Sequence, residues 1–312
     1  MLARVAENIY WMARYLERAE DMARLINVNA SLALDLPRGL APIWSQLIAI
    51  SGAQGLYPET DYDEAPVLKF LVCDEGSPVS MLSCIACARE NARTIRDVIP
   101  REVWESINAL YLYAREHQQL ALNKRGRFRF LNDVIRHGQT TSGVLSGTMS
   151  HDAGYTFLRI GRYLERADMT SRIVDIRSAN LLPEVATARA TYDNLQWMSV
   201  LSSLSGYQMY RREMQIRVQR AAVLKFLLQS REFPRALRFC IDAVRRAVVS
   251  MPNAGGALDI IEDIARRLDE AQPAVLKQTE LQLFIDQLQI GFARIHDELQ
   301  AAYFSGGAAN AA

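Results

Sequence analysis

The chain has 312 residues, half of them apolar, which is enough to bury one large core or two domain-sized cores. Its formal net charge is +1, so the charge balance gives no indication of binding to nucleic acid or to an anionic membrane surface. The N-terminus lacks an apolar signal-peptide core, no stretch long enough to span a bilayer is free of charged or strongly polar residues, and the four cysteines are few for a secreted disulfide scaffold. These features predict a cytoplasmic protein that does not enter a membrane.

Helical spacing of apolar residues extends through almost the whole sequence, and the strict alternation typical of strands is missing. The first predicted helix, residues 2–34, carries one apolar stripe at steps of three and four: Ile9, Met12, Leu16, Ala19, Ala23, Ile26 and Ala30. Helix-breaking segments then divide the chain up to residue 148 into about six helices: Pro37-Arg38-Gly39, residues 52–63, Gly76-Ser77-Pro78, Ile99-Pro100, Lys124-Arg125-Gly126 and Gly147.

A second long helix is predicted over residues 151–180, with a stripe of its own: Phe157, Ile160, Leu164, Ala167, Ser171, Val174 and Ser178. Further breakers cut residues 149–304 into about six helices as well: Pro183, Gly206, Pro234, residues 252–256 and Pro273. The tail, residues 305–312, has small side chains and nothing to pack, so we expect it to be disordered.

The two long helices share an identical hexapeptide. Arg14-Tyr15-Leu16-Glu17-Arg18-Ala19 returns letter for letter, 148 residues later, as Arg162-Tyr163-Leu164-Glu165-Arg166-Ala167. Further matches follow in the same order, at offsets that drift from 148 to 156: Trp44 with Trp197, Ser51-Gly52 with Ser205-Gly206, residues 67–71 with 223–227, Pro78 with Pro234, and Cys84-Ile85 with Cys240-Ile241. Matches in a fixed order indicate a tandem duplication. We therefore predict an all-α fold of two pseudo-equivalent helical bundles, residues 1–148 and 149–304, related by an approximate twofold axis.

Charged side chains in both motifs lie three or four residues apart, so each helix offers ion pairs within itself: Arg14 with Glu17, Glu20 with Arg24, Arg162 with Glu165, and Asp168 with Arg172. Exposed pairs stabilise by about 0–1 kcal/mol each and are easily lost from a drifting duplicate. Retention in both halves indicates partly buried contacts, because removing one partner of a buried pair costs about 3–5 kcal/mol. Two interpretations remain open: a structural network between the two helices, or a polar cleft that contacts a ligand.

Three segments resemble the bacterial alpha-E proteins, a helical family named for its ER motif: residues 1–20, residues 157–168, and Ala88-Arg89-Glu90-Asn91-Ala92-Arg93. The genes of this family tend to lie beside those of a circularly permuted ATP-grasp protein and a transglutaminase-like protease. The resemblance therefore implies an ATP-grasp type amide ligase and a transglutaminase-like protein as partners in the synthesis, modification or trimming of a peptide-like compound. It brings no catalytic residue, so the candidate site is the motif itself: Arg14, Tyr15, Glu17, Arg18, Arg162, Tyr163, Glu165 and Arg166.

Other residue patterns predict no second site. Cys84 and Cys87 have redox or metal spacing without a second pair, so buried thiols are the favoured interpretation. Asp133 and His137 lack the Glu-x-x-His partners of a di-iron bundle, and His151-Asp152 lacks an identifiable nucleophile. Phosphate-binding and dinucleotide-binding loops, nucleophile elbows and basic stripes with interleaved aromatic residues are missing. We expect no cofactor, no metal and no nucleic-acid partner.

Two main functional hypotheses follow. The first is a noncatalytic accessory or scaffold protein that acts with the ligase. The second is an enzyme in which Glu17 and Glu165 supply acid-base chemistry while Arg18 and Arg166 bind an anionic group; a small-ligand sensor would use the same cleft. A dry, fully paired contact between the motifs would favour the first, and an open polar cavity with a shifted carboxylate pKa would favour the others.

Overall fold

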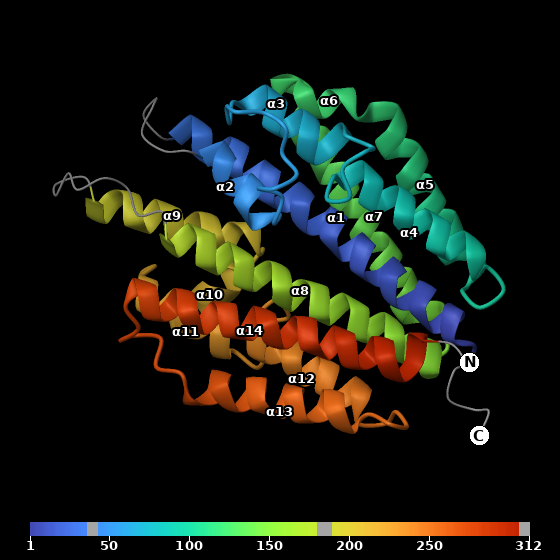
Figure 1. Cartoon of the computed structure of the whole chain (residues 1–312). Helices are drawn as coiled ribbons and strands as arrows, with labels where there is room; N and C mark the ends of the chain where they lie inside the picture. Colours follow the sequence, from blue (N-terminus) through green and yellow to red (C-terminus); the bar gives the residue numbers. More distant parts are fainter. Residues whose placement is uncertain (36–42, 180–188, 306–312) are drawn as a thin grey trace.

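The computed structural model describes residues 1–35, 43–179 and 189–305, and over these ranges it is all-helical. Two long helices form its centre, α1 (Ala3–Asp35) and α8 (Ala153–Ala179). They lie side by side through the middle of the molecule (Figure 1). The helical spacing of the apolar residues therefore predicted the fold class correctly.

The first 148 residues continue with α2 (Ile43–Ile50), α3 (Glu64–Leu68), the π-helical turn η1 (Lys69–Cys73), α4 (Met81–Thr94), α5 (Arg101–His117), α6 (Gln119–Leu122) and α7 (Lys124–Thr148). Helices α4 and α7 pack against α1, and α5 packs against both of them. Local sequence sets several of these boundaries. The Ser80 hydroxyl accepts a hydrogen bond from the backbone N–H of Ser83 at 3.1 Å and caps α4, while Asn123 caps α7 in the same way.

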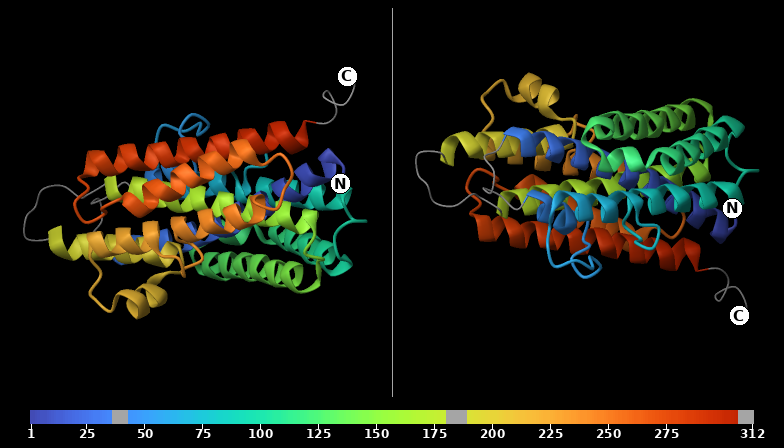
Figure 2. Two further views of the ribbon diagram at one scale, coloured as in Figure 1. Left: turned by 90° about the horizontal axis from the view of Figure 1, so that it is seen from below. Right: turned by 90° about the horizontal axis from the view of Figure 1, so that it is seen from above.

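The remaining chain adds α9 (Arg189–Ser203), α10 (Tyr207–Met214), α11 (Arg220–Gln229), α12 (Leu237–Val248), α13 (Gly255–Glu270), α14 (Gln278–Leu299) and a second π-helical turn, η2 (Gln300–Phe304). Helices α12 and α14 pack against α8, and α13 packs against both. In Figure 2 the helices of the second half face the viewer from below, and those of the first half face the viewer from above. The central pair thus lies between two groups of helices.

The predicted apolar stripes form the core of this arrangement. On α1 the stripe from Ile9 to Ile26 is buried, and on α8 every predicted stripe residue from Phe157 to Ser178 is buried. Small residues let the two backbones approach closely. A Cβ atom added at Gly161 would lie only 2.4 Å from the carbonyl oxygen of Tyr10. The two ER motifs are therefore held against each other.

Two boundary predictions need comment. Each half contains seven α-helices among the described residues rather than about six. In the first half the extra helix is α6, which follows α5 after the single residue Gln118, where neither glycine nor proline marks the break. The breakers Pro37 to Gly39 and Pro183, and residues 306–312 of the expected disordered tail, lie outside the described residues. No helix in the described ranges combines the length and apolarity needed to cross a membrane.

Candidate functional site at the crossed ER motifs

The two ER motifs bind each other across the α1–α8 contact. Arg18 donates to Glu165, from Nε to Oε1 at 2.5 Å and from Nη2 to Oε2 at 3.0 Å. Arg166 donates to Glu17 in the same pattern, from Nε to Oε1 at 2.6 Å and from Nη2 to Oε2 at 2.9 Å. Each arginine therefore holds the glutamate of the other motif in a bidentate fork, the strongest common geometry between these two groups.

Both glutamates are buried, with only 3% of Glu17 and 1% of Glu165 exposed. A buried carboxylate is costly unless cations and hydrogen-bond donors surround it. Glu165 receives a second guanidinium from Arg14, whose Nε lies 2.6 Å from Oε2. Glu17 receives its second guanidinium from Arg235, just before α12, with Nη1 3.1 Å from Oε1. Each carboxylate thus faces two arginines from distant parts of the chain.

Two predictions about pairing within a helix were wrong. Arg14 does not pair with Glu17, nor Arg162 with Glu165, among the ion pairs of the described residues; Arg14 instead reaches across to Glu165. Arg162 is enclosed near Glu17, and burial lowers its pKa. The two predicted pairs at i+4 do form: Arg24 with Glu20 at 2.5 Å, and Arg172 with Asp168 at 3.0 Å.

The tyrosines of the motifs shield the outer sides of the arginines. The guanidinium carbon of Arg18 lies 5.8 Å from the ring centroid of Tyr15, and that of Arg166 lies 5.3 Å from the ring centroid of Tyr163. These are cation–π distances, and each tyrosine stands three residues before its arginine on the same helix. The repeated tyrosine therefore has the same physical role in both motifs.

The electrostatics fix both glutamates in the charged state. Burial alone would raise the pKa of Glu17 and of Glu165, but the facing arginines outweigh it and lower both to about 2. A general acid or base needs a pKa near the working pH and a free path to the reacting proton. Because Glu17 and Glu165 are ionised and occupied by arginines, they suit the joining of two helices better than the transfer of a proton.

Arg235 is the member of this network that the sequence analysis missed. Its buried guanidinium lies among three carboxylates of α1: Glu17 at 3.1 Å, Glu20 at 3.3 Å and Asp21. Burial raises the pKa of Asp21 to about 7, although Arg235 opposes the shift. One signal for Arg235 was present in the sequence. Arg235 directly follows Pro234, which matches Pro78, but the residue after Pro78 is the uncharged Val79.

A cavity of ≈ 180 Å³ opens beside the Arg18–Glu165 pair. Ten residues from α1, α8, the end of α2 and the turn before α4 line it: Arg18, Met22, Ile50, Ser51, Gly52, Val79, Glu165, Asp168, Met169 and Arg172. Neither Glu17 nor Arg166 belongs to its lining. The contact between the motifs is therefore paired and buried around Glu17, and adjoins an open polar space beside Glu165.

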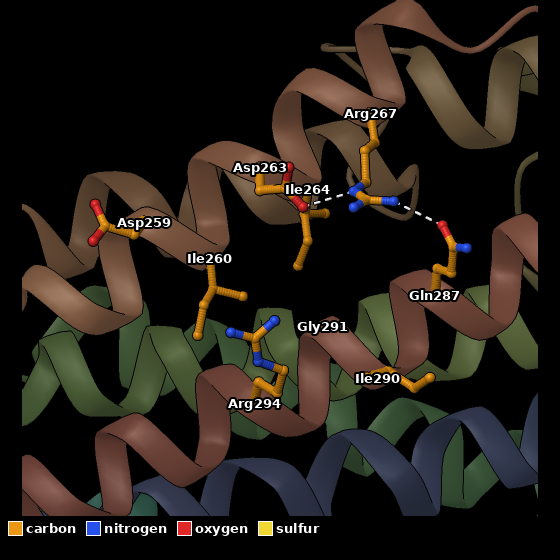
Figure 3. Close-up of a pocket in the computed structure, with 9 residues that line it drawn as sticks. All are labelled: Asp259, Ile260, Asp263, Ile264, Arg267, Gln287, Ile290, Gly291 and Arg294. Carbon is orange, nitrogen blue, oxygen red and sulfur yellow. Dashed lines mark hydrogen bonds and ion pairs between the residues drawn. The ribbon is translucent and has the colours of Figure 1, made fainter.

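A second hollow, of ≈ 350 Å³, follows the seam between α13 and α14 (Figure 3). Its charged walls are largely engaged with each other. Arg267 donates to Asp263 at 2.6 Å and to Gln287 at 2.7 Å, while the side chain of Arg294 extends across the hollow toward Ile260. No residue of either ER motif contributes to this hollow.

The other residues considered from the sequence do not assemble into a site. All four cysteines are free thiols, and burial raises the pKa of Cys84 and of Cys240 to about 12. Cys84 is buried as predicted, whereas the prediction for Cys87 was wrong, because Cys87 is exposed. Asp133 accepts a hydrogen bond from Tyr113 at 2.8 Å. In the parts of the chain that the structure describes, no group of three or more His, Cys, Asp or Glu residues is arranged to hold a metal ion.

Comparison with known proteins assigns the family. A family model described as Alpha-E, a predicted alpha-helical domain with a conserved ER motif, matches residues 1–304. The chain is 24% identical over 322 residues to the uncharacterized protein Rv2567 of Mycobacterium tuberculosis, and 25% identical to the uncharacterized protein Mb2597 of Mycobacterium bovis. Both alignments cover 95% of this chain but 36% of the relative, so the chain spans about a third of the length of these curated relatives. No solved structure is significantly similar to it. The chain belongs to the Alpha-E family.

Proposed function

We propose that this chain is a noncatalytic scaffold that acts in the cytoplasm with an ATP-grasp type amide ligase and a transglutaminase-like protein, in the synthesis or modification of a peptide. The crossed ER motifs are the observation that carries this proposal. Glu17 and Glu165 are buried, ionised and each bound by two arginines. The motif that names the family thus acts as a clamp between helices, which gives a rigid body for holding partners.

The proposal includes an internal duplication. Residues 1–148 and 149–304 would be two copies of one helical repeat, related by an approximate twofold axis between α1 and α8. Three observations support this: the ordered sequence matches, the crossed exchange of glutamates, and the packing of α4 and α7 on α1 in the way that α12 and α14 pack on α8. A duplicated scaffold offers two similar faces, and could contact a separate partner with each.

The identity of the partners rests on the family resemblance, and one comparison supports an accessory role. In the mycobacterial relatives the matched region is 36% of the protein, so there it is joined to a longer stretch of other sequence. The region that matches this chain is thus one part of a longer protein in these relatives. Such an arrangement is typical of a domain that works together with a neighbouring domain of different function.

The proposal is tested by affinity capture. The tagged full chain would be incubated at physiological salt with the ATP-grasp ligase encoded beside it, with ATP and candidate peptide substrate present. We expect a stable complex whose amount does not change when Glu90, an exposed residue outside the ER network, is replaced by glutamine. A ligase that neither binds the chain nor changes its turnover when the chain is added would contradict the proposal.

The enzyme hypothesis retains one supporting observation. Arg18 and Glu165 line the ≈ 180 Å³ cavity together with Asp168, and burial raises the pKa of Asp168. If catalysis occurred there, Asp168 would be the carboxylate able to exchange a proton. Replacing it with asparagine distinguishes the two hypotheses, because turnover by the complete system would be lost for an enzyme and kept for a scaffold, provided that circular dichroism shows unchanged folding.

A further inference from the structure

The residues that line the cavity beside the first ER motif have equivalents beside the second motif, which we call the filled surroundings because the buried side chain of Arg235 lies there. The sequence matches give every lining residue an equivalent at an offset of 148 to 156 residues. Arg18 corresponds to Arg166 and Glu165 to Glu17; the remaining equivalents are Thr170, Leu204, Ser205, Gly206, Arg235, Glu20, Asp21 and Arg24. Several of these equivalents contact one another, since Arg24 donates to Ser205 at 2.5 Å and Arg235 binds Glu20 and Asp21. The two surroundings can therefore be compared residue by residue.

Five of the ten matched positions differ between the open cavity and the filled surroundings, and at two of them a neutral residue stands where the other half has a charged one. Val79 stands where the second half has Arg235, and Met169 stands where the first helix has Asp21. In the filled surroundings the Arg235 side chain occupies the space and binds Asp21. In the open surroundings the valine is too short to do so, and the ≈ 180 Å³ remain empty between Val79 and the charged groups. The open cavity is thus bordered by a short apolar side chain at the position where the filled surroundings have a buried arginine.

The two arginines that line the cavity have N–H groups that no carboxylate or other oxygen in the described ranges accepts, although Arg18 also has the Cys84 thiol as a hydrogen-bond partner. Arg18 commits Nε and Nη2 to Glu165, and Arg172 commits Nε to Asp168. Arg18 Nη1 and both Nη groups of Arg172 donate to no oxygen acceptor among the described residues. The two oxygens of Glu165 already accept three N–H groups from Arg14 and Arg18, and Asp168 accepts one from Arg172. The free N–H groups of Arg18 and Arg172 therefore favour a ligand that accepts hydrogen bonds.

The charges and the apolar residues around the cavity restrict the chemical class of the ligand further. The cavity is lined by two arginines, Arg18 and Arg172, and by two carboxylates, Glu165 and Asp168. Arg14 binds Glu165 from outside this lining, and with it the arginines around the cavity outnumber the carboxylates by one. A monoanion would balance that excess, a phosphate dianion would overshoot it beside two carboxylates, and a cation would meet no third carboxylate because Met169 replaces aspartate. The rest of the lining is apolar: Met22, Ile50, Val79 and Met169.

We propose that this cavity binds a small organic monocarboxylate. Its carboxylate would lie between Arg18 and Arg172, for which the planar guanidinium fork is well suited, and its apolar body would lie against Val79 and Met169. Gly52 helps to place Arg172, because its φ of +70° and the position of Arg172 Nη1, 2.7 Å from where a Cβ would be, leave room only for glycine. The proposal does not depend on the partnership with the ligase.

Butyrate is a suitable probe, with butylammonium as its cationic counterpart of similar shape. Ligand-observed NMR on the full chain, at constant ionic strength in chloride, would measure binding of butyrate, butylammonium and inorganic phosphate separately. We expect saturable butyrate binding with a Kd on the order of 1 mM, as is attainable for so few atoms, and weaker binding of the other two. Tighter binding of butylammonium or of phosphate, or no saturable butyrate binding, would overturn the proposal.

Variants locate the bound carboxylate. Arg172→Gln should weaken butyrate binding by about tenfold, since one charge-assisted contact is lost, whereas the counterpart change Arg24→Gln should leave it within about twofold. The double variant Val79→Arg/Met169→Asp introduces the arginine and the aspartate of the filled surroundings and should abolish binding. If Arg172→Gln, in a side chain one-third exposed and so tolerant of change, binds butyrate as tightly as the unaltered chain, the site is not in this cavity. The measurement on Arg172→Gln therefore tests the location of the site even if the double variant fails to fold.

Discussion

At the scale of single residues, the crossed pairing gives each residue of the repeated hexapeptide a structural role in both long helices. Leu16 and Leu164 are buried in the core, Ala19 and Ala167 allow close packing, and the two tyrosines cover arginines. Each glutamate is bound by arginine from the opposite motif. A change in one motif therefore removes a partner from a buried charge in the other, which couples the stability of the two helices.

Removing one of these glutamates should be costly. We expect Glu165→Gln to lower the free energy of unfolding by about 3–5 kcal/mol, because Arg14 and Arg18 would remain buried without their anion. Urea unfolding followed by circular dichroism measures this. The matched control is Glu90→Gln, whose half-exposed side chain pairs with Arg89 and Arg93 and should change stability by less than about 1 kcal/mol. Equal effects from the two changes would contradict a structural role for the ER motif.

Acid should unfold the protein through the same two glutamates. Their folded pKa is about 2, below the unfolded value of about 4.3. A lowered carboxylate pKa stabilises the folded state above the unfolded pKa, and this contribution is lost as the pH falls through the folded pKa. Stability should therefore decrease steeply between about pH 4.5 and pH 2, as measured by urea unfolding at a series of pH values. A stability that stays constant over that range would show that the carboxylates are not paired.

Asp21 should change the stability of the protein with pH in the direction opposite to Glu17 and Glu165. Burial raises its folded pKa to about 7, so the folded state binds a proton that the unfolded state does not bind between about pH 7 and pH 4. Its contribution to stability should therefore increase as the pH falls through that range. In Asp21→Asn this increase should disappear while the loss below about pH 4.5 remains. The same pH series on both proteins measures the difference, and identical profiles would contradict it.

At the scale of the elements, the crossed pairs depend on how closely α1 approaches α8. Gly161 sits at the contact, and a Cβ added there would lie 2.4 Å from the carbonyl oxygen of Tyr10 and 3.3 Å from Cβ of Ala13. A backbone carbonyl within a helix cannot turn aside as a long side chain can. Any larger residue at this position must separate the two helices and lengthen the Arg–Glu contacts nearby.

Gly161→Ala should therefore destabilise the protein although alanine favours helices. We expect a loss of about 1–3 kcal/mol, typical of overpacking in a filled core. Gly143→Ala in α7 is the matched control, because nothing lies within 4 Å of its added Cβ, and it should stabilise by up to about 1 kcal/mol. Thermal unfolding of the two variants gives the comparison. A stabilising Gly161→Ala would show that the helices are not in such close contact.

At the scale of the whole molecule, the interactions that stabilise each half come from the other half. Glu17 of the first half depends on Arg166 and Arg235, and Glu165 of the second depends on Arg14 and Arg18. The α1–α8 contact also buries both apolar stripes together. Neither half can therefore unfold without exposing apolar surface and unpaired charges in the other.

We accordingly expect one cooperative unfolding transition for the whole chain. Three of the four tryptophans, Trp11, Trp44 and Trp104, lie in the first half, so their fluorescence reports mainly on that half, while circular dichroism reports on both. In urea the two signals should change together, which is the test for two-state behaviour. Two separate transitions would contradict the coupling of the halves.

The sequence by itself determined that the chain is helical and where the two apolar stripes lie, and it indicated that the repeated charged residues are partly buried. These properties are local or nearly so, because helical periodicity and a retained hexapeptide can be read without knowing what lies opposite. Only the tertiary structure decided the partner of each charge. The spacing allowed Arg14 to bind Glu17, but the position of α8 offers it Glu165, and Arg235 reaches Glu17 from more than two hundred residues away. The cavity likewise depends on Val79 and Met169, which share one space only after the helices have packed.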